Sequence, residues 1–228
     1  STIDTDHSFI DRMTESLRHR GPNGRGTAVF DKRCEILTLD VDNQNETIVS
    51  PSSFGRLSLG HRRLSVIDPE HSSNQPMGYL KGRYWIVFNG EIYNYIELKS
   101  ELEELGHVFL TKSDTEVILA AYHQWGIECQ NKFNGMWAFC IIDRVERKIF
   151  LSRDRFGEKP LYYSVCGDVL YFASEIKAIF SSGEINSEIT TENASSFIKN
   201  GPVEYGKETI YENIFNLMPG CYLHISLD

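Results

Sequence analysis

The sequence has no C-x-x-C pair, no cluster of basic residues and no apolar run of membrane-spanning length. Its cysteines number five, an odd count, so neither a disulfide framework nor a zinc site is indicated, and we expect no metal ligands. The balance of 23 Lys and Arg against 32 Asp and Glu argues against nucleic acid or an anionic membrane as a partner. The first residues also lack the charged-then-apolar order of a secretion signal. Together these absences predict a soluble protein of the cytoplasm.

The composition is that of an ordinary globular protein, with 41% hydrophobic and 12% aromatic residues. A chain of 228 residues can bury a substantial core. Because no repeat and no low-complexity linker divides it, we expect one domain over residues 1–228. The acidic balance suits a small molecule or another protein as the partner.

The stretch YWIVFNGEIYNY, residues 84–95, is the centre of the predicted site. Its first five residues are aromatic or β-branched, which predicts a buried strand that ends at Asn89, Gly90 and Glu91. The Asn89 carboxamide and the backbone N–H of Gly90, which has no Cβ, are two donors suited to an oxyanion hole. Asn-Gly is also a frequent hairpin dipeptide, so a plain turn is the alternative.

The flanking sequence predicts helices and further strands. Apolar residues at helical spacing indicate a helix that stops at Gly106, and the S-D-T-E sequence at 113–116 predicts a capping box that places Asp114 in the first turn of the next helix. Residues 42–55 are polar, and we expect a surface loop. Beyond Gly135, four strand-like runs separated by short turns predict an antiparallel meander.

Five residues at the expected ends of elements have the chemistry to hold a free amino acid: Arg63, Asn89, Gly90, Glu91 and Asp114. A guanidinium fork suits an α-carboxylate, two acids suit an α-ammonium, and the Asn and Gly donors would face a carbonyl. Single residues also have structural interpretations, because Asp114 can complement a helix dipole and Arg63 can pair with a surface acid. As a set, the five residues predict one pocket.

Six motifs, in order along the chain, resemble the N-terminal glutaminase domain of asparagine synthetase and its relatives, a class II glutamine amidotransferase domain. They are LGHRRLSVID, FNGEIYNY, SDTEVILAAYHQWG, NGMWAFCIID, RDRFGEKPLYY and FASEIKAIF. RHRGPNG also resembles that domain's RHRGPD turn, with Asn23 in place of the aspartate. The resemblance therefore covers most of the chain, from near Arg18 to near Ile225.

The resemblance implies an α+β fold of the N-terminal-nucleophile hydrolase type, a four-layer αββα sandwich of two antiparallel sheets between helical layers. In that family an N-terminal cysteine attacks the side-chain amide of glutamine, and its own α-amine serves as the base. Carried onto this sequence, Asn89 and Gly90 match the oxyanion donors and Arg63 matches the contact to the glutamine carboxylate. Glu91 and Asp114 match the ammonium contacts.

Three apolar residues complete the site that the resemblance implies. Leu64, Val66 and Ile67 match positions that line the glutamine pocket in the family. They follow Arg63 directly, so the carboxylate contact and the apolar wall come from one segment.

The front of the chain departs from the family, which begins Cys-Gly-Ile where this sequence begins Ser1-Thr2-Ile3. No cysteine precedes Cys34, and Cys140 lies in the apolar run WAFCII, where a core position is expected. Ser1 has the hydroxyl and α-amine of a known type of N-terminal catalyst, but the polar segment leads almost at once into a predicted helix. We therefore expect that about ten residues, with the nucleophile and its strand, are missing from the front and that the chain as written is inactive. Loss of that strand should leave ladder groups open in the sheet.

Nothing in the chain resembles the SGG-x-DS loop with which the family's synthetase domain binds ATP, so we expect that domain to be absent. This domain then needs no cofactor of its own, whereas ATP and Mg²⁺ belong to a synthetase domain acting in cis or in trans. The resemblance implies that the parent uses ammonia from glutamine to convert aspartate to asparagine.

Three alternatives stay open beside this assignment. One is a glutaminase-like binding or regulatory module without its nucleophile. Another is an amidotransferase domain for a sugar or other carboxylate. The third, a peptidase, is disfavoured because Arg63 and Asp114 would bind the two charged ends of a free amino acid. A homodimer is an open possibility for the assembly.

Overall fold

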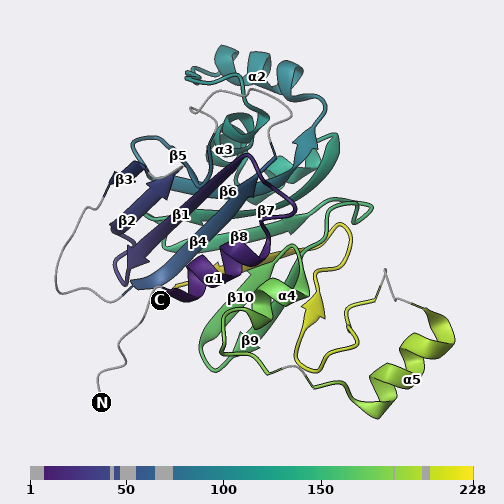
Figure 1. The fold of residues 1–228 in the computed structure, drawn as a ribbon. Helices are drawn as coiled ribbons and strands as arrows, with labels where there is room; N and C mark the ends of the chain where they lie inside the picture. Colours follow the sequence, from purple (N-terminus) through teal and green to yellow (C-terminus); the bar gives the residue numbers. More distant parts are fainter. Residues whose placement is uncertain are drawn as a thin grey trace.

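The computed structural model describes residues 8–41, 44–46, 55–64, 74–186, 188–201 and 206–227. It contains three antiparallel sheets (Figure 1). The first, in the order β3-β2-β1-β4, consists of β1 (Gly24–Asp31), β2 (Ile36–Val41), β3 (Gln44–Glu46) and β4 (Gly55–Arg63). The second, in the order β12-β8-β7-β6-β5, consists of β5 (Met77–Tyr79), β6 (Tyr84–Ile92), β7 (Gly135–Asp143), β8 (Lys148–Arg153) and β12 (Tyr222–Ser226). The third, in the order β10-β9-β11, consists of β9 (Tyr162–Cys166), β10 (Val169–Ala173) and β11 (Phe215–Asn216).

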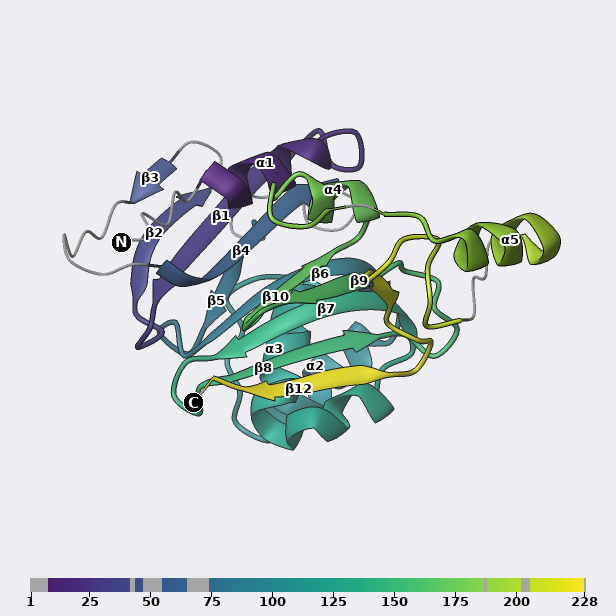
Figure 2. The same ribbon diagram turned by 90° about the horizontal axis from the view of Figure 1, so that it is seen from below.

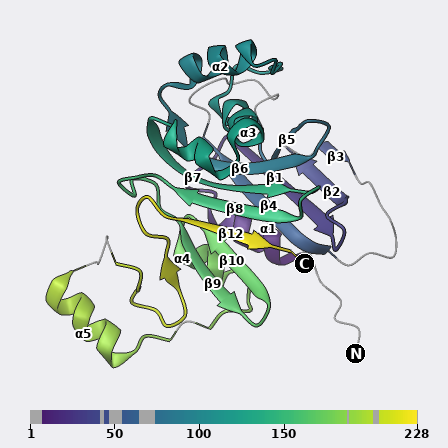
Figure 3. The same cartoon turned by 180° about the vertical axis from the view of Figure 1, so that it is seen from behind.

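Helices cover both outer faces of these sheets. These helices are α1 (Ser8–Ser16), α2 (Tyr95–Glu104), α3 (Asp114–Trp125) and α4 (Ile176–Phe180). A 3-10 helix at Gly126–Asn131 follows α3, and α5 (Thr191–Asn200) extends away from the sheets (Figure 1). Figure 2 shows the layers in order: α1 and α4, then the first and third sheets, then the second sheet, then α2 and α3. From behind, α2 and α3 lie across the outer face of the second sheet (Figure 3).

β6 is buried on both faces because the layers enclose it. Alternate side chains point to opposite faces of a strand, so Ile86 and Phe88 pack against α2 and α3. Trp85 and Val87 point the other way, into the core between the sheets, where they join Phe30 of β1. This alternation explains why the sequence of β6 reads as a continuous apolar run rather than an alternating one.

β4 and β10 are edge strands that, among the described residues, are paired on one side only. β4 is hydrogen-bonded to β1 on one side, and β10 is hydrogen-bonded to β9 on one side. Helix α1 bridges the region between them, because it packs on β4 and its Arg12 donates to the carbonyl oxygens of Ser181 and Ser182 just after α4. The first and third sheets therefore lie in one layer with open edges between them.

The structure corrects four expectations. β6 continues to Ile92 and pairs with β7 along its whole length, so Asn89, Gly90 and Glu91 lie inside a strand rather than beyond its end, and the hairpin alternative is excluded. Part of the expected loop, Gln44–Glu46, forms β3.

The other two corrections concern the meander and the capping box. The meander is interrupted, because β8 pairs with β12 and not with β9. The predicted N-cap is confirmed, since the Ser113 side chain accepts from the Thr115 N–H. The Glu116 carboxylate, however, binds the N–H groups of Leu110 and Thr111 instead of that of Ser113.

Within the described ranges, no helix is long and apolar enough to cross a membrane.

Candidate functional site

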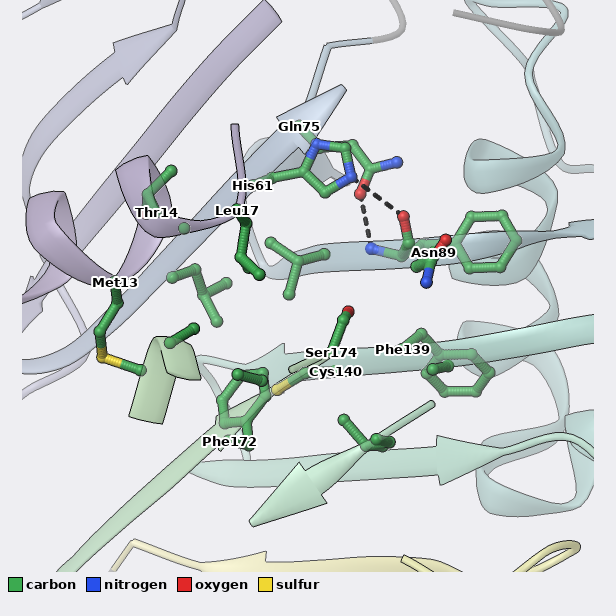
Figure 4. A pocket seen from close by; sticks show the side chains of 18 of the residues that line it. Met13, Thr14, Leu17, His61, Gln75, Asn89, Phe139, Cys140, Phe172 and Ser174 are labelled. Carbon is green, nitrogen blue, oxygen red and sulfur yellow. Dashed lines mark hydrogen bonds between the residues drawn. The ribbon is translucent and has the colours of Figure 1, made fainter. Parts of the chain in front are cut away.

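A cavity of about 1120 Å³ lies between the first two sheets and extends to β10 and α1. Its walls come from β4, β6, β7, β10 and the inner face of α1 (Figure 4). The structure brings six of the predicted site residues to these walls: Arg63, Leu64, Asn89, Gly90, Glu91 and Asp114. Val66 and Ile67 lie outside the described residues. The roles of all these residues in binding stay predictions.

The outer edge of β6, away from β7, presents its backbone groups to the site. The N–H of Phe88 is bound by the Gln75 side-chain oxygen at 2.6 Å, and the N–H of Ile92 is bound by Asp114 Oδ2 at 3.0 Å. Because backbone groups two residues apart point to the same side of a strand, the N–H of Gly90 is directed to this same edge. It therefore lies between two occupied donors and faces the cavity.

Gly90 is glycine for a packing reason. A Cβ at this position would overlap the Met136 carbonyl oxygen and would lie 2.7 Å from the Phe88 ring. β6 and β7 approach too closely here for any side chain, so the Gly90 N–H is presented without a Cβ beside it.

The Asn89 side chain supplies a second donor. Asn89 lies two residues after Val87 in β6, so its side chain is on the same face of the strand and points into the space between the sheets. Its Nδ2 atom is buried and, within the described part of the chain, has no hydrogen-bond partner. The Asn89 amide and the Gly90 N–H thus offer two donors from adjacent residues to the cavity, the kind of pair that an oxyanion hole uses.

Asp114 is held at the start of α3, where it is 5% exposed. Burial raises the pKa of its carboxyl group, the hydrogen bonds from the Ile92 and Thr115 N–H groups oppose that rise, and the nearby Glu91 carboxylate adds to it. A cation placed between Asp114 and Glu91 would relieve the repulsion between these two acids. The arrangement therefore suits an ammonium group.

Arg63 and Leu64 form another part of the wall, at the end of β4. The Arg63 guanidinium donates to Asn74 Oδ1, which tethers it beside the segment that leads into β5. Leu64 is 59% exposed and lies at the mouth of the cavity. The cationic group and the two acids are thus carried by different elements that meet only in the folded chain.

Two residues of this region were not singled out as site residues in the sequence. His61 lies in β4 and its Nε2 is 3.1 Å from the carbonyl oxygen of Phe88, while Gln75 binds the N–H of the same residue (Figure 4). The unusual row of His61, Arg62 and Arg63 on a strand was a signal for the histidine. Nothing in the local pattern marked Gln75.

Among the described residues that line the cavity, Cys140 is the one cysteine, and it is a core residue. Cys140 lines the cavity, but burial raises the pKa of its thiol, so it stays protonated and unreactive. It is 1% exposed in the core between the sheets, which confirms the predicted core position. Ser1 lies outside the described residues.

Comparison of the sequence with known proteins identifies a matching domain family and several relatives. The model of the glutamine amidotransferase domain family matches residues 44–228. Asparagine synthetase (glutamine-hydrolyzing) 1 of Bacillus subtilis is 45% identical over 66% of this chain and 26% of its own length. Putative asparagine synthetase (glutamine-hydrolyzing) 2 of Methanocaldococcus jannaschii is 36% identical over 96% of this chain and 41% of its own length. This chain therefore spans less than half the length of these two curated relatives.

Solved structures share the fold. The glutamine phosphoribosylpyrophosphate amidotransferase from B. subtilis superposes with a TM-score of 0.62 at 24% identity, over 77% of this chain and 41% of that one. A structure described as the allosteric regulatory enzyme of purine biosynthesis gives 0.69 at 23% identity, over 96% of this chain and 44% of that one. The predicted α+β fold, a sandwich of antiparallel sheets between helical layers, is confirmed.

Proposed function

Because the chain belongs to the glutamine amidotransferase domain family, we propose that it is the glutaminase part of a glutamine-hydrolysing asparagine synthetase. In this function the domain releases ammonia from glutamine, and a synthetase domain, in cis or in trans, uses the ammonia with ATP and Mg²⁺ to convert aspartate to asparagine. Two relatives of this chain are named glutamine-hydrolyzing asparagine synthetases, which supports this assignment. The five free cysteines fit a reducing cytoplasm, where we place the enzyme.

The observation that carries the proposal is the pair of donors at Asn89 and Gly90 beside two acids and an arginine in one cavity. Glutamine binds with its α-carboxylate on Arg63 and its α-ammonium between Asp114 and Glu91. Leu64 lies along the glutamine side chain, and Val66 and Ile67, which lie outside the described residues, keep the pocket-lining role that the family motif predicts. The amide oxygen then lies between Asn89 Nδ2 and the Gly90 N–H.

These donors stabilise the charge that develops during hydrolysis. A thiolate adds to the amide carbon, the C=O π electrons move to the oxygen, and the resulting oxyanion is held by the two donors. Collapse of this intermediate breaks the C–N bond, the leaving nitrogen takes a proton, and ammonia departs. A thioester remains, which water hydrolyses to glutamate.

In this proposal the attacking thiol is that of an N-terminal cysteine, and this sequence has no cysteine before Cys34. The open edges of β4 and β10 line the same cavity as Asn89 and offer backbone groups with which a strand that carries the cysteine can pair. The chain as written therefore has the oxyanion donors and the substrate contacts but no nucleophile. It is inactive on its own, because an oxyanion hole without a nucleophile accelerates amide hydrolysis only modestly.

The test compares the natural protein with this chain. Intact mass and N-terminal sequencing define the natural front end, and ammonia release from glutamine is then measured for the natural protein and for purified residues 1–228. We expect release from the first and none from the second. Steady release by residues 1–228 would contradict the missing nucleophile and would return Ser1 to consideration, whereas a natural protein that starts at Ser1 and is inactive would favour a binding or regulatory module.

A further inference from the structure

β5 leaves part of the edge of β6 without a backbone partner. The ladder between these strands pairs Tyr79 with Tyr84 and ends where Met77 pairs with Ile86. Phe88 is the next residue of β6 whose backbone groups face this edge. β5 begins at Met77, and Pro76 before it has no N–H with which to continue the ladder.

Two side chains take the place of the missing ladder at Phe88. Gln75 Oε1 accepts from the Phe88 N–H at 2.6 Å, and His61 Nε2 lies 3.1 Å from the Phe88 carbonyl oxygen (Figure 4). Both backbone groups of Phe88 are therefore held, and they are held by side chains from two different segments. We call these two side chains, His61 and Gln75, the clamp. Phe88 directly precedes Asn89, so the clamp holds the residue next to the two oxyanion donors.

The imidazole of His61 is a donor in this contact. A carbonyl oxygen only accepts, so Nε2 carries the hydrogen. Burial lowers the pKa of His61 to about 4, and the charge of Arg63 acts in the same direction, although the hydrogen bond to Phe88 opposes it. The ring is thus neutral at physiological pH and keeps a single N–H directed at Phe88.

The clamp is packed rigidly against the first sheet. Gln75 is 8% exposed, and a Cβ at Gly26 would overlap the Gln75 carbonyl oxygen. Gly26 is also the register partner of His61 in the β1–β4 ladder. Because Gly26 has no side chain, the backbone of Gln75 can pack against β1 beside His61. The first sheet therefore holds both side chains that bind Phe88 at the edge of β6.

We propose that His61 and Gln75 are positioning residues that set the geometry of the Asn89 and Gly90 donors by holding the backbone of Phe88. The inference rests on the proposed glutaminase function, because only a developing oxyanion needs these donors placed to within a fraction of an ångström. It assigns His61 no contact with substrate and no proton transfer.

The kinetic test uses the full natural protein. His61→Leu removes the donor and Gln75→Met removes the acceptor, each with little change in size. We expect kcat for glutamine hydrolysis to fall about 10- to 100-fold while KM stays within about twofold, because ground-state binding does not use the clamp. His61→Gln, which keeps an N–H at a similar reach, should recover most of the lost kcat. His123→Leu is the matched control, since His123 also binds a β6 residue, the Tyr84 hydroxyl, but at the far end of the strand.

A second readout does not depend on catalysis. In residues 1–228, Gln75→Met should raise the hydrogen-exchange rate of the Phe88 amide about tenfold and shift the NMR signals of the Gly90 amide and the Asn89 carboxamide. His123→Leu should leave all three unchanged.

The outcomes separate the two proposals. A natural protein that hydrolyses no glutamine overturns the proposed function and with it the catalytic meaning of the clamp. An active protein in which both clamp variants keep full kcat, or in which His61→Gln is as impaired as His61→Leu, overturns the positioning role alone. Unchanged exchange at Phe88 in Gln75→Met also overturns it.

Discussion

Asn89 keeps a buried amide donor without a hydrogen-bond partner among the described residues. Leaving such a group unsatisfied costs about 1–3 kcal/mol, and native interiors contain few of them. The neighbouring Gly90 N–H faces the same cavity, so the open donor is not an isolated packing fault. The physical interpretation is that a ligand oxygen completes the hydrogen bonds of both residues.

We predict that Asn89→Ala in the natural enzyme lowers kcat for glutamine hydrolysis by about 10²- to 10³-fold, because one of two oxyanion donors is lost. Steady-state ammonia release measures the effect. Asn131→Ala is the control, since the Asn131 side chain is exposed and bound only to Glu128. Equal turnover in Asn89→Ala and Asn131→Ala would remove Asn89 from catalysis.

His61 makes the stability of residues 1–228 depend on pH. Its pKa is about 4 in the folded chain and 6.5 as the reference value, so between these values the unfolded chain binds a proton that the folded chain does not. Stability is therefore full above pH 6.5 and is lost as the pH falls towards 4. We predict a loss on the order of 2 kcal/mol between pH 7 and pH 5.

Urea unfolding of the wild type and His61→Gln at both pH values measures this loss. Burial also lowers the pKa of His123, which acts in the same direction, so the difference between the two proteins isolates His61. Glu175 does not interfere, because its pKa is about 2 and its contribution is lost only at lower pH. The same pH dependence in His61→Gln would refute the assignment.

At the scale of the elements, the open edges of β4 and β10 are the main feature of the fold. Both edges line one cavity, which Ile10 and Met13 of α1 and Leu17, just after this helix, cover. Thr14 Oγ1 is buried beside Gly60 of β4 without a hydrogen-bond partner within the described residues. An apolar strand in this slot would satisfy ladder groups on two sides and fill the apolar part of the cavity.

We predict that residues 1–228 extended at the N-terminus by an apolar, strand-forming segment are at least about 2 kcal/mol more stable than residues 1–228 alone, because several apolar side chains become buried. Urea denaturation measures the difference. The matched control carries the same extension with two prolines, which cannot donate to the ladders. If both extensions give the stability of residues 1–228, the slot does not hold a strand.

At the scale of the whole molecule, the proposed function assigns the cavity to glutamine but does not name the acceptor. All six site residues that the structure describes line one cavity, and their chemistry matches the two charged ends and the amide of one amino acid. Relatives with the same domain differ in name, since the amidase chry2 of Gibberella zeae is 28% identical over 94% of this chain. We propose that acceptor choice is made by the synthetase domain that acts with this one.

We predict that the parent protein, given glutamine, ATP, Mg²⁺ and aspartate, forms asparagine in amounts equal to the aspartate consumed. Amino-acid analysis of the reaction mixture is the measurement, and omission of aspartate is the control. Glutamine consumption coupled to ATP but independent of aspartate would move the assignment to an amidotransferase for a sugar or another carboxylate.

Local sequence was enough to predict the family and most elements. The run from Tyr84 to Phe88 predicts a buried strand, and Ser113 predicts the N-cap of α3. The side chains of Arg63, Asn89 and Asp114 have charges and donors that suit a free amino acid as the ligand. These features depend on side-chain type, alternation and capping, which are properties of a few consecutive residues.

Only the tertiary structure decided where β6 ends, which strands meet and what holds the oxyanion donors. The polar residues of β6 stay in the strand because the pairing of β6 with β7 continues as far as Ile92. β8 does not pair with β9 because β12 pairs with the free edge of β8. The clamp on Phe88 joins His61 and Gln75 across gaps of 27 and 13 positions. Such pairings depend on which backbone groups remain open after the sheets have formed, and a local sequence pattern carries no information about them.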